Sequence, residues 1–185
     1  PVSDGFVIPY GETPTRSNEV GKTVYASIFN SASKYVHIMT PYFIIDREFL
    51  DCMRYAAARG VEVSMILPHI PDKKVIYYIA RTFYPVLLEA GIKVYEYTPG
   101  FVHAKVFVSD DICATVGTIN LDYRSFYHHF ECGAYFYDSS VVAKVEEDFQ
   151  ATILKCQEVT LDYYHKLPLY QKIIGRTSRL LAPLL

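Results

Sequence analysis

The sequence lacks the features that mark a membrane-spanning, zinc-binding or strongly basic protein. No pair of its four cysteines has CxxC spacing, and no Cys–His cluster of the kind that holds zinc occurs. Charged residues interrupt the apolar runs well before 18 residues, so we expect no transmembrane helix. The net charge of −2 and the pI of about 6.3 argue against a basic field that grips nucleic acid. We therefore expect free thiols in a reducing compartment, no metal, no cofactor and no nucleic-acid partner. The cysteines are Cys52, Cys113, Cys132 and Cys156.

The N-terminus also lacks a signal-peptide pattern, and its first residue is Pro rather than Met. A chain that begins this way is expected to be a piece of a longer protein, so the missing signals say nothing of the parent. We expect the piece itself to be soluble.

Apolar residues, by contrast, are plentiful. Hydrophobic residues make up 51% of the 185 positions and aromatic residues 15%, which is enough to build a core and makes disorder a poor explanation. The length favours one domain with a short extension. We place the domain at residues 1–160 and the extension at residues 161–185.

Strand patterns alternate with helix patterns, which predicts an α/β fold with a mixed β-sheet flanked by helices on both faces. The clearest helix lies over 46–60, where Asp46 can cap the start, an apolar stripe follows and Gly60 can end it. The pattern predicts further helices over 18–33 (capped by Asn18), 72–90 (kinked at Pro85) and 142–156. It predicts strands over 5–10, 35–40, 61–68, 92–97, 102–108, 112–116 and 130–137.

The C-terminal extension has no acidic residue after Asp162. Its basic residues alternate with Leu, Ile and Tyr, which is typical of a segment that lies on a membrane surface or binds a partner. The same pattern is typical of a terminal helix that packs on its own domain with its basic residues in water. The sequence leaves both alternatives open. The basic residues are Lys166, Lys172, Arg176 and Arg179.

One stretch, FVHAKVFVSDDICATVGTIN (101–120), combines a strand pattern with polar groups that a core strand does not need. Because side chains alternate across a strand, His103 and Lys105 share one face. Gly117 permits a sharp turn or a close backbone approach to a ligand, and Thr118 and Asn120 add a hydroxyl and an amide. An imidazole, an ammonium, a hydroxyl and an amide together suit a phosphate group.

This stretch resembles the HxKxxxxD…G[ST]xN signature of the phospholipase D superfamily. The flanking segments VHIMTPYFIIDREFLDCMRYAAARGVEVSMILP and VGTINLDYRSFYHHFECGAYFYD resemble the C-terminal half of bacterial cardiolipin synthases. The resemblance covers nearly all of the chain. Thr118 stands where the superfamily usually has Ser, and it keeps the hydroxyl. The implied fold is one phospholipase D-like half.

The resemblance implies a metal-free reaction through a covalent phosphohistidine, in a site built from two motifs that face each other. This chain carries one motif, so it would supply half of a site. The second half would lie in the same parent chain or come from a homodimer. By analogy His103 would be the general acid/base, although in a self-paired dimer either copy could be the nucleophile.

The resemblance also assigns roles to the other site residues. Lys105 and Asn120 would bind the phosphate oxygens, with Gly117 and Thr118 in the same phosphate-binding turn. Asp110 would be mainly architectural. Glu131 would orient the motif His through its other ring nitrogen, unless it is a carboxylate at the rim of a strand.

The implied activity is transfer of a phosphatidyl group between two phosphatidylglycerol molecules at a bacterial cell membrane, on its cytoplasmic, reducing side. The alternatives are a phosphodiesterase that uses water, as a lipase or a dimeric nuclease, and a catalytically silent pairing half. The other histidines are expected to be structural. The TPYF run (40–43) ends a strand, where α/β proteins place their ligands, or it is an ordinary strand terminus. The segment 72–84, with cations beside aromatics, fits an anionic lipid interface, single-stranded nucleic acid or an ordinary amphipathic helix.

Overall fold

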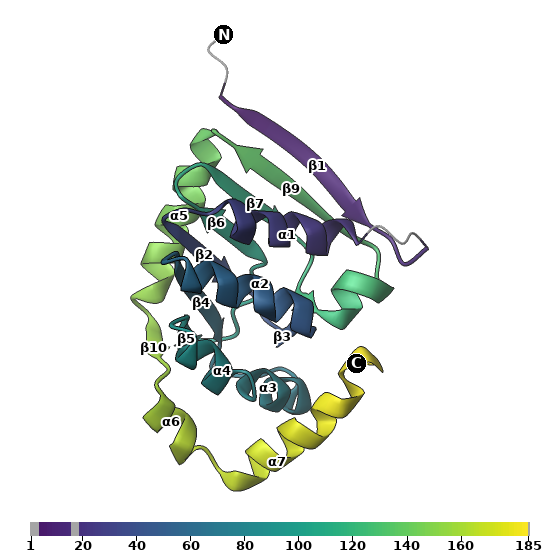
Figure 1. Cartoon of the computed structure of the whole chain (residues 1–185), viewed down its shortest axis with the longest axis vertical. Helices are drawn as coiled ribbons and strands as arrows, with labels where there is room; N and C mark the ends of the chain where they lie inside the picture. The colour runs from purple at the N-terminus through teal and green to yellow at the C-terminus, as the bar shows by residue number, and fades with distance from the viewer. Residues whose placement is uncertain (1–3, 16–18, 185) are drawn as a thin grey trace.

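The computed structural model describes residues 4–15 and 19–184, and its centre is one eight-stranded sheet (Figure 1). The strand order is β1-β9-β7-β6-β2-β4-β5-β10. Strands β2, β4 and β5 run parallel to one another, and the other neighbouring pairs are antiparallel. The sheet is therefore mixed, as the sequence predicts. Its strands are β1 (Phe6–Glu12), β2 (Tyr35–Met39), β4 (Glu62–Pro68), β5 (Lys93–Tyr97), β6 (Val106–Ser109), β7 (Cys113–Gly117), β9 (Glu131–Tyr137) and β10 (Cys156–Glu158).

Helices cover both faces of this sheet, which confirms the expected α/β class. On β2, Val36 and Ile38 join the larger core beneath α1 and α2, whereas Met39 packs with Phe149 of α5 on the opposite face. Figure 1 shows α1 and α2 crossing one face of the sheet. The helices are α1 (Val20–Ser31), α2 (Arg47–Ala58), α3 (Lys74–Arg81), α4 (Tyr84–Glu89) and α5 (Ser140–Ile153).

Helix α2 begins and ends as its sequence predicts. The Asp46 side chain accepts a hydrogen bond from Phe49 N, 2.8 Å away, and Gly60 adopts a left-handed φ of 89°. The helix expected over 72–90 is instead two helices, which are separated at residues 82–83, before Pro85. Asn18, the expected cap of α1, lies outside the described residues.

The strand expected over 102–108 is shorter in the structure, because β6 begins only at Val106. Residues 101–105 form no strand, and a single backbone bond from Gly117 N to Lys105 O, 3.2 Å long, continues the β6–β7 pairing. Cys156, expected on the last helix, instead begins β10 at the edge of the sheet. Both boundaries depend on which residues form hydrogen bonds with a neighbouring strand, and a local sequence pattern does not reveal those pairings.

A second, two-stranded sheet was not expected. It pairs β3 (Phe43–Ile44) in parallel with β8 (Leu121–Asp122). A π-helical turn, η1 (Arg124–His128), follows β8. This small sheet brings the residues after Asn120 beside the end of the TPYF run.

The C-terminal segment folds back onto its own domain, with α6 (Leu161–Lys166), α7 (Leu169–Ser178) and the 3₁₀ turn η2 (Arg179–Leu184). Gly175 lies so close to Tyr78 of α3 that an added Cβ would be 2.3 Å from the Tyr78 carbonyl oxygen. The Tyr163 hydroxyl donates to the fully buried Glu96 carboxylate, which also accepts a two-point ion pair from Arg81. Several apolar side chains of this segment remain exposed nevertheless: Leu169, Tyr170, Ile173, Leu180, Leu181 and Leu184.

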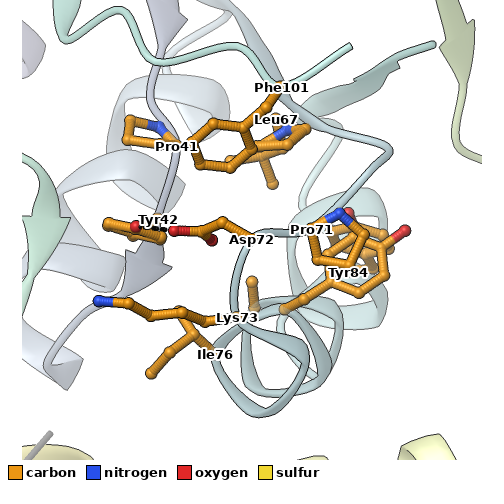
Figure 2. Close-up of a pocket in the computed structure, with 12 residues that line it drawn as sticks. Pro41, Tyr42, Leu67, Pro71, Asp72, Lys73, Ile76, Tyr84 and Phe101 are labelled. Carbon is orange, nitrogen blue, oxygen red and sulfur yellow. Dashed lines mark hydrogen bonds between the residues drawn. The ribbon is translucent and has the colours of Figure 1, made fainter.

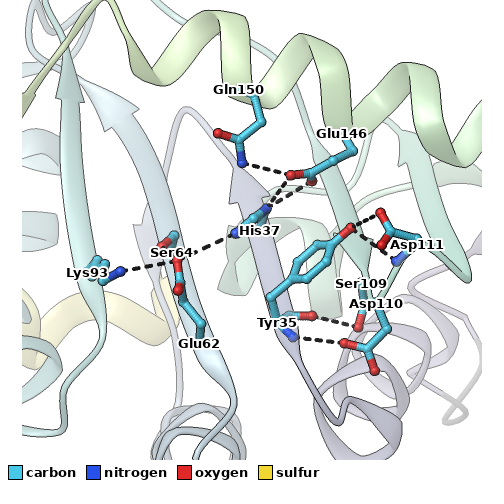
Figure 3. A network of polar contacts seen from close by, with 10 residues as sticks. All are labelled: Tyr35, His37, Glu62, Ser64, Lys93, Ser109, Asp110, Asp111, Glu146 and Gln150. Atoms are coloured by element: carbon cyan, nitrogen blue, oxygen red, sulfur yellow. Dashed lines mark hydrogen bonds and ion pairs between the residues drawn. The ribbon is translucent and has the colours of Figure 1, made fainter.

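His37 is a satisfied core residue, as expected (Figure 3). Its ring lies between Tyr35 and Phe149, with centroid separations of 4.3 and 4.4 Å. Its Nδ1 lies 2.9 Å from a Glu146 carboxylate oxygen. The contact joins β2 to α5 on the face opposite α1 and α2, so His37 supports the sheet and contacts no residue of the sequence-predicted site.

Candidate active site

The His103 and Lys105 side chains meet directly in front of β6. The Lys105 ammonium donates to the His103 carbonyl oxygen at 2.7 Å, and its nitrogen lies 3.1 Å from His103 Nδ1. Lys105 is nearly buried, whereas the His103 side chain is exposed. Phe107, on the same side of the strand, is fully buried and stacks on Tyr25 at 4.2 Å. The chain therefore passes directly from this polar pair into the buried aromatic core.

Burial and charge shift the proton equilibria of this pair. Partial burial and the nearby Lys105 ammonium lower the pKa of the His103 imidazole below its usual 6.5. Burial likewise lowers the pKa of Lys105, although the carboxylates of Glu131 and Asp122 oppose that shift. Both effects favour the neutral imidazole over the imidazolium.

Gly117 permits a close approach, but to protein backbone rather than to a ligand. A Cβ at this position would lie 2.4 Å from the Cys132 carbonyl oxygen and 2.7 Å from Gly133 Cα. The end of β7 therefore fits against β9 only because residue 117 has no side chain. The sequence led us to expect a sharp turn or the close approach of a ligand at Gly117, whereas the structure places the neighbouring strand there.

The residues after Gly117 form one hydrogen-bonded cluster around Glu131. The Thr118 hydroxyl donates to one carboxylate oxygen of Glu131, and Ser125 Oγ donates to the other at 2.9 Å. Asn120 Nδ2 in turn donates to Ser125 Oγ at 3.0 Å. The single hydroxyl proton of Thr118 is thus used inside the chain, and its direct bond to a phosphate stays a prediction.

The expected contact by which Glu131 would orient a motif His stays a prediction. Both carboxylate oxygens of Glu131 are occupied by Thr118 and Ser125, and among the described residues no hydrogen bond joins Glu131 to the His103 ring. The ring nitrogen Nδ1 faces Lys105 instead. Within this half, Glu131 therefore holds the Thr118–Asn120 turn in place.

Asp110 has the architectural geometry that the resemblance implies. Its carboxylate accepts four hydrogen bonds, from the backbone N–H groups of Ser33, Lys34 and Tyr35 and from the Ser33 hydroxyl, at 2.7–2.9 Å. Burial would raise the pKa of Asp110, but these donors outweigh it and the pKa is lowered. Asp110 thereby ties the β6–β7 turn to the start of β2, at the opposite end of β6 from His103.

Sequence reasoning missed Ser125 and Asp122 as parts of the site. Ser125 links Asn120 to Glu131, and its backbone N–H donates to the largely buried Asp122 carboxylate at 2.8 Å. Burial raises the pKa of that carboxyl. The sequence pattern did not predict the π-helical turn that brings the Ser125 hydroxyl back to Asn120. Ser125 therefore looked like an ordinary polar residue between two strands.

The TPYF run and the segment 72–84 meet at a hollow beside this site (Figure 2). Figure 2 shows the Tyr42 hydroxyl donating to Asp72 and the Lys73 side chain passing below the Tyr42 ring. The ring of Phe101 lies 6.3 Å from that of Tyr42 and 5.6 Å from that of His103. Aromatic side chains thus connect this hollow with the reactive imidazole. In the part of the chain that the structure describes, no three His, Cys, Asp or Glu side chains form a group that could hold a metal.

Sequence comparison places this geometry among known proteins. A family model described as "Cardiolipin synthase, PLD-like domain" matches residues 25–153. An uncharacterised protein from Streptococcus mutans is 50% identical over 184 residues, which is 100% of this chain and 40% of that protein. Cardiolipin synthase 2 from Bacillus anthracis is 40% identical over 172 residues, which is 93% of this chain and 34% of that protein. The chain thus spans about a third to two fifths of the length of these curated relatives.

Solved structures share the fold. The phospholipase D family member Nuc from Salmonella typhimurium has a TM-score of 0.70 at 15% identity, covering 83% of this chain and 97% of Nuc. Phosphatidylserine synthase from Haemophilus influenzae has a TM-score of 0.74 at 21% identity, covering 97% of this chain and 48% of that one. The family match covers more than half of the sequence, and the resemblance seen in the motif is confirmed. The chain belongs to the cardiolipin synthase family of phospholipase D-like domains.

Proposed function

We propose that this chain supplies one half of the active site of a phosphatidyl transferase of the cardiolipin synthase type. The observation that carries the proposal is the placement of the His103 imidazole beside the nearly buried Lys105 ammonium. Such a pair combines a base or nucleophile with a positive charge for an anionic phosphodiester. The family match and the cardiolipin synthase relatives favour a phospholipid as that phosphodiester.

The proposed reaction has two steps and uses a second histidine from the other half. One imidazole nitrogen attacks phosphorus, the bond from phosphorus to the glycerol oxygen breaks, and the other imidazole gives that oxygen a proton. The hydroxyl of a second phosphatidylglycerol then loses its proton to the same imidazole and attacks phosphorus, which breaks the phosphorus–nitrogen bond. The products are cardiolipin and glycerol, and His103 takes one of the two roles.

Lys105 and Asn120 are the groups that we assign to the phosphate oxygens. Lys105 has three donors and Asn120 Nδ2 has two, so each keeps one beyond its contacts within the chain. Glu131 supports this pair indirectly, since Ser125 connects it to Asn120. The assignment makes Thr118 and Ser125 the supports of the phosphate site.

The test is a product assay on the active assembly, meaning this chain together with its second half, whether in one longer chain or as a pair. Phosphatidylglycerol vesicles and single-stranded DNA are supplied in separate reactions, with His103→Asn and the exposed His165→Asn as matched variants. We expect the wild type to release one glycerol for each cardiolipin that it forms. We expect the same products at the same rate from His165→Asn. We expect at least a 10³-fold lower rate from His103→Asn, because the reaction loses an essential imidazole.

Other outcomes separate the alternatives. Phosphatidic acid without cardiolipin would indicate a hydrolase, and cut DNA would indicate a nuclease. Full turnover by His103→Asn would show that the other half does the chemistry alone. Measuring the oligomeric state of this chain shows whether it pairs with itself.

We further propose that helix α7 lies against the phospholipid surface. Among the described residues, no helix is long and apolar enough to cross a bilayer. Leu169, Tyr170 and Ile173 of α7 are nevertheless exposed, beside basic side chains that suit anionic lipid. Co-sedimentation with phosphatidylglycerol vesicles, and not with phosphatidylcholine vesicles, is the expected result, and Ile173→Glu should weaken it. Equal binding to both vesicles, or none, would contradict this role.

A further inference from the structure

A cavity of about 230 Å³ opens between the β3–β8 pair and the start of α3. It shares Tyr42, Lys73 and Ile76 with the hollow in Figure 2, and its other side reaches Asn120. Asn120 is therefore both a wall residue of this cavity and one of the two residues that we assign to the phosphate oxygens. The remaining wall residues are Ile44, Asp122, Tyr123, Arg124 and His129.

The wall carries more positive charge than negative charge. Lys73 and Arg124 both line it, and in the described part of the chain neither forms an ion pair with a carboxylate. Arg124 Nε donates to His129 Nε2 at 3.1 Å, and the Lys73 ammonium lies 5.5 Å from the centre of the Tyr42 ring. Two cations line this cavity, and the one carboxyl group in its wall, that of Asp122, forms an ion pair with neither of them, which suits an anionic group such as a phosphodiester.

The same wall also offers hydrogen-bond acceptors. Asn120 Oδ1 is shielded from solvent and has no donor among the described residues, although a buried oxygen normally has one. The Asn120 amide is fixed in this orientation, because its nitrogen donates to Ser125 while Ser125 donates onward to Glu131. Asp122 adds a largely buried carboxyl beside it. A ligand with free hydroxyl groups would match these acceptors.

Apolar side chains complete the cavity, chiefly Ile44, Ile76 and the ring of Tyr123. The cavity is smaller than the roughly 300–1,000 Å³ typical of a site for a drug-sized ligand, so it has room for a headgroup and not for a whole lipid. The ligand that these features describe has one negative charge, at least one hydroxyl and a short carbon backbone. A phosphoglycerol group has all three.

We propose that this cavity binds the phosphoglycerol headgroup of the acceptor lipid, with Arg124 and Lys73 on its phosphate and Asn120 and Asp122 near its hydroxyl groups. The inference rests on the proposed transfer function and names the acceptor site of that reaction. The donor phosphorus sits at His103 and Lys105, which do not line the cavity. Asn120 lines the cavity and is also one of the two groups that we assign to the donor phosphate, so a hydroxyl held there would lie next to the phosphorus.

The first test measures binding and needs no turnover. Soluble glycerophosphoglycerol is titrated into the active assembly by calorimetry, with inorganic phosphate as a second probe. We expect Arg124→Gln and Lys73→Gln each to weaken glycerophosphoglycerol binding about tenfold, since each removes a charge-assisted contact. Arg54→Gln is the matched control, because it removes one charge at a site that does not line the cavity, and it should bind like the wild type.

Two binding outcomes would overturn the proposal. If Arg124→Gln and Lys73→Gln bind glycerophosphoglycerol as tightly as Arg54→Gln does, the cavity is not its site. If inorganic phosphate binds as tightly as glycerophosphoglycerol with the same sensitivity to both variants, the site recognises free phosphate and not a headgroup.

The second test follows the fate of the donor. A cavity that cannot hold the acceptor leaves the phosphohistidine to water, so Arg124→Gln should raise the ratio of phosphatidic acid to cardiolipin about tenfold, and Arg54→Gln should leave it unchanged. An unchanged ratio in Arg124→Gln contradicts the acceptor site. If the wild type releases no glycerol at all, the proposed function fails, and the binding test still decides what the cavity recognises.

Discussion

Lys105 holds His103 at two points, through the backbone oxygen and through Nδ1 of the ring. An ammonium has no acceptor, so Nδ1 accepts this hydrogen bond and the neutral ring carries its proton on Nε2. A ring in this tautomer offers an N–H toward the site. For Nε2 to attack phosphorus, the proton would have to move to Nδ1, where a partner other than Lys105 must accept it. In this conformation the His103 ring is therefore not ready to act as a nucleophile.

The pKa of His103 should lie below 6.5, since partial burial and the Lys105 charge both disfavour the imidazolium. As pH falls through that pKa the ring is protonated and loses its function as a base, so activity should decline on the acid side. Lys105→Met removes the charge and keeps most of the volume, and it should raise the pKa of His103 toward 6.5. Titration of the ring resonances by NMR measures the shift. An unchanged pKa would show that burial alone sets it.

Glu131→Gln should lower turnover while the protein stays folded. The amide keeps one acceptor oxygen for the two hydroxyl groups of Thr118 and Ser125, so one hydrogen bond is lost and the Asn120 turn loosens. We expect about a tenfold lower kcat with little change in KM, as for other residues that position a reacting group. The exposed Glu158→Gln serves as the matched control.

A merely structural role for Glu131 would give a different result. It would lower the free energy of unfolding and leave the pH profile of the remaining activity as in the wild type. Loss of the carboxylate that faces Lys105 should instead lower the pKa of that lysine further and move the profile. Wild-type turnover would remove Glu131 from the site altogether.

Asp110→Asn should destabilise the protein at neutral pH and not in strong acid. The pKa of Asp110 is lowered in the folded state, so its contribution is present above about pH 3.8 and is lost as pH falls through the folded pKa. The backbone angle φ is 58°, a left-handed value that Asn tolerates, so the substitution changes charge and acceptor number more than backbone strain. We expect a loss of about 2 kcal/mol at pH 7 by urea denaturation.

Asp111→Asn is the control for this experiment. Asp111 has a similar φ of 60°, but its carboxylate accepts one hydrogen bond, from the exposed hydroxyl of Tyr35. Its cost should stay below about 0.5 kcal/mol. Equal losses from the two variants would mean that the four hydrogen bonds of Asp110 contribute nothing specific.

Local chemistry in the sequence was enough to predict the parts of the fold that depend on it. Asp46 caps α2 and Gly60 ends it, because a side-chain acceptor and a left-handed residue act within one helical turn. Pro85, in the first turn of α4, marked an irregularity in the helix expected over 72–90. It did not reveal that the helix ends at Arg81 and that a new one begins at Tyr84. The start of β6 at Val106 was equally hidden, because it depends on which residues of β2 and β7 remain to pair.

The candidate site likewise has one part that the sequence predicts and one part that it does not. Strand alternation predicts that His103 and Lys105 share a face, and the structure places their side chains in contact. The cavity beside them could not be predicted, since its wall combines residues 42–44, 73–76 and 120–129, which only the β3–β8 pairing brings together. Ser125 was missed for the same reason.

The close packing of β7 against β9 leads to a prediction about the geometry of the site. Gly117→Ala places a Cβ within 2.4–2.7 Å of backbone atoms of Cys132 and Gly133, and backbone cannot move aside as a flexible side chain does. We expect a loss of about 2 kcal/mol or more in the free energy of unfolding. Gly100→Ala is the matched control, because nothing lies within 4 Å of its added Cβ, and it should change stability by less than about 0.5 kcal/mol. The Gly117 N–H also donates to the Lys105 carbonyl, so relief of the clash moves Lys105 relative to Asn120. Turnover of Gly117→Ala should therefore fall even at temperatures where the variant is fully folded, and normal turnover there would show that the position of Lys105 does not depend on β7.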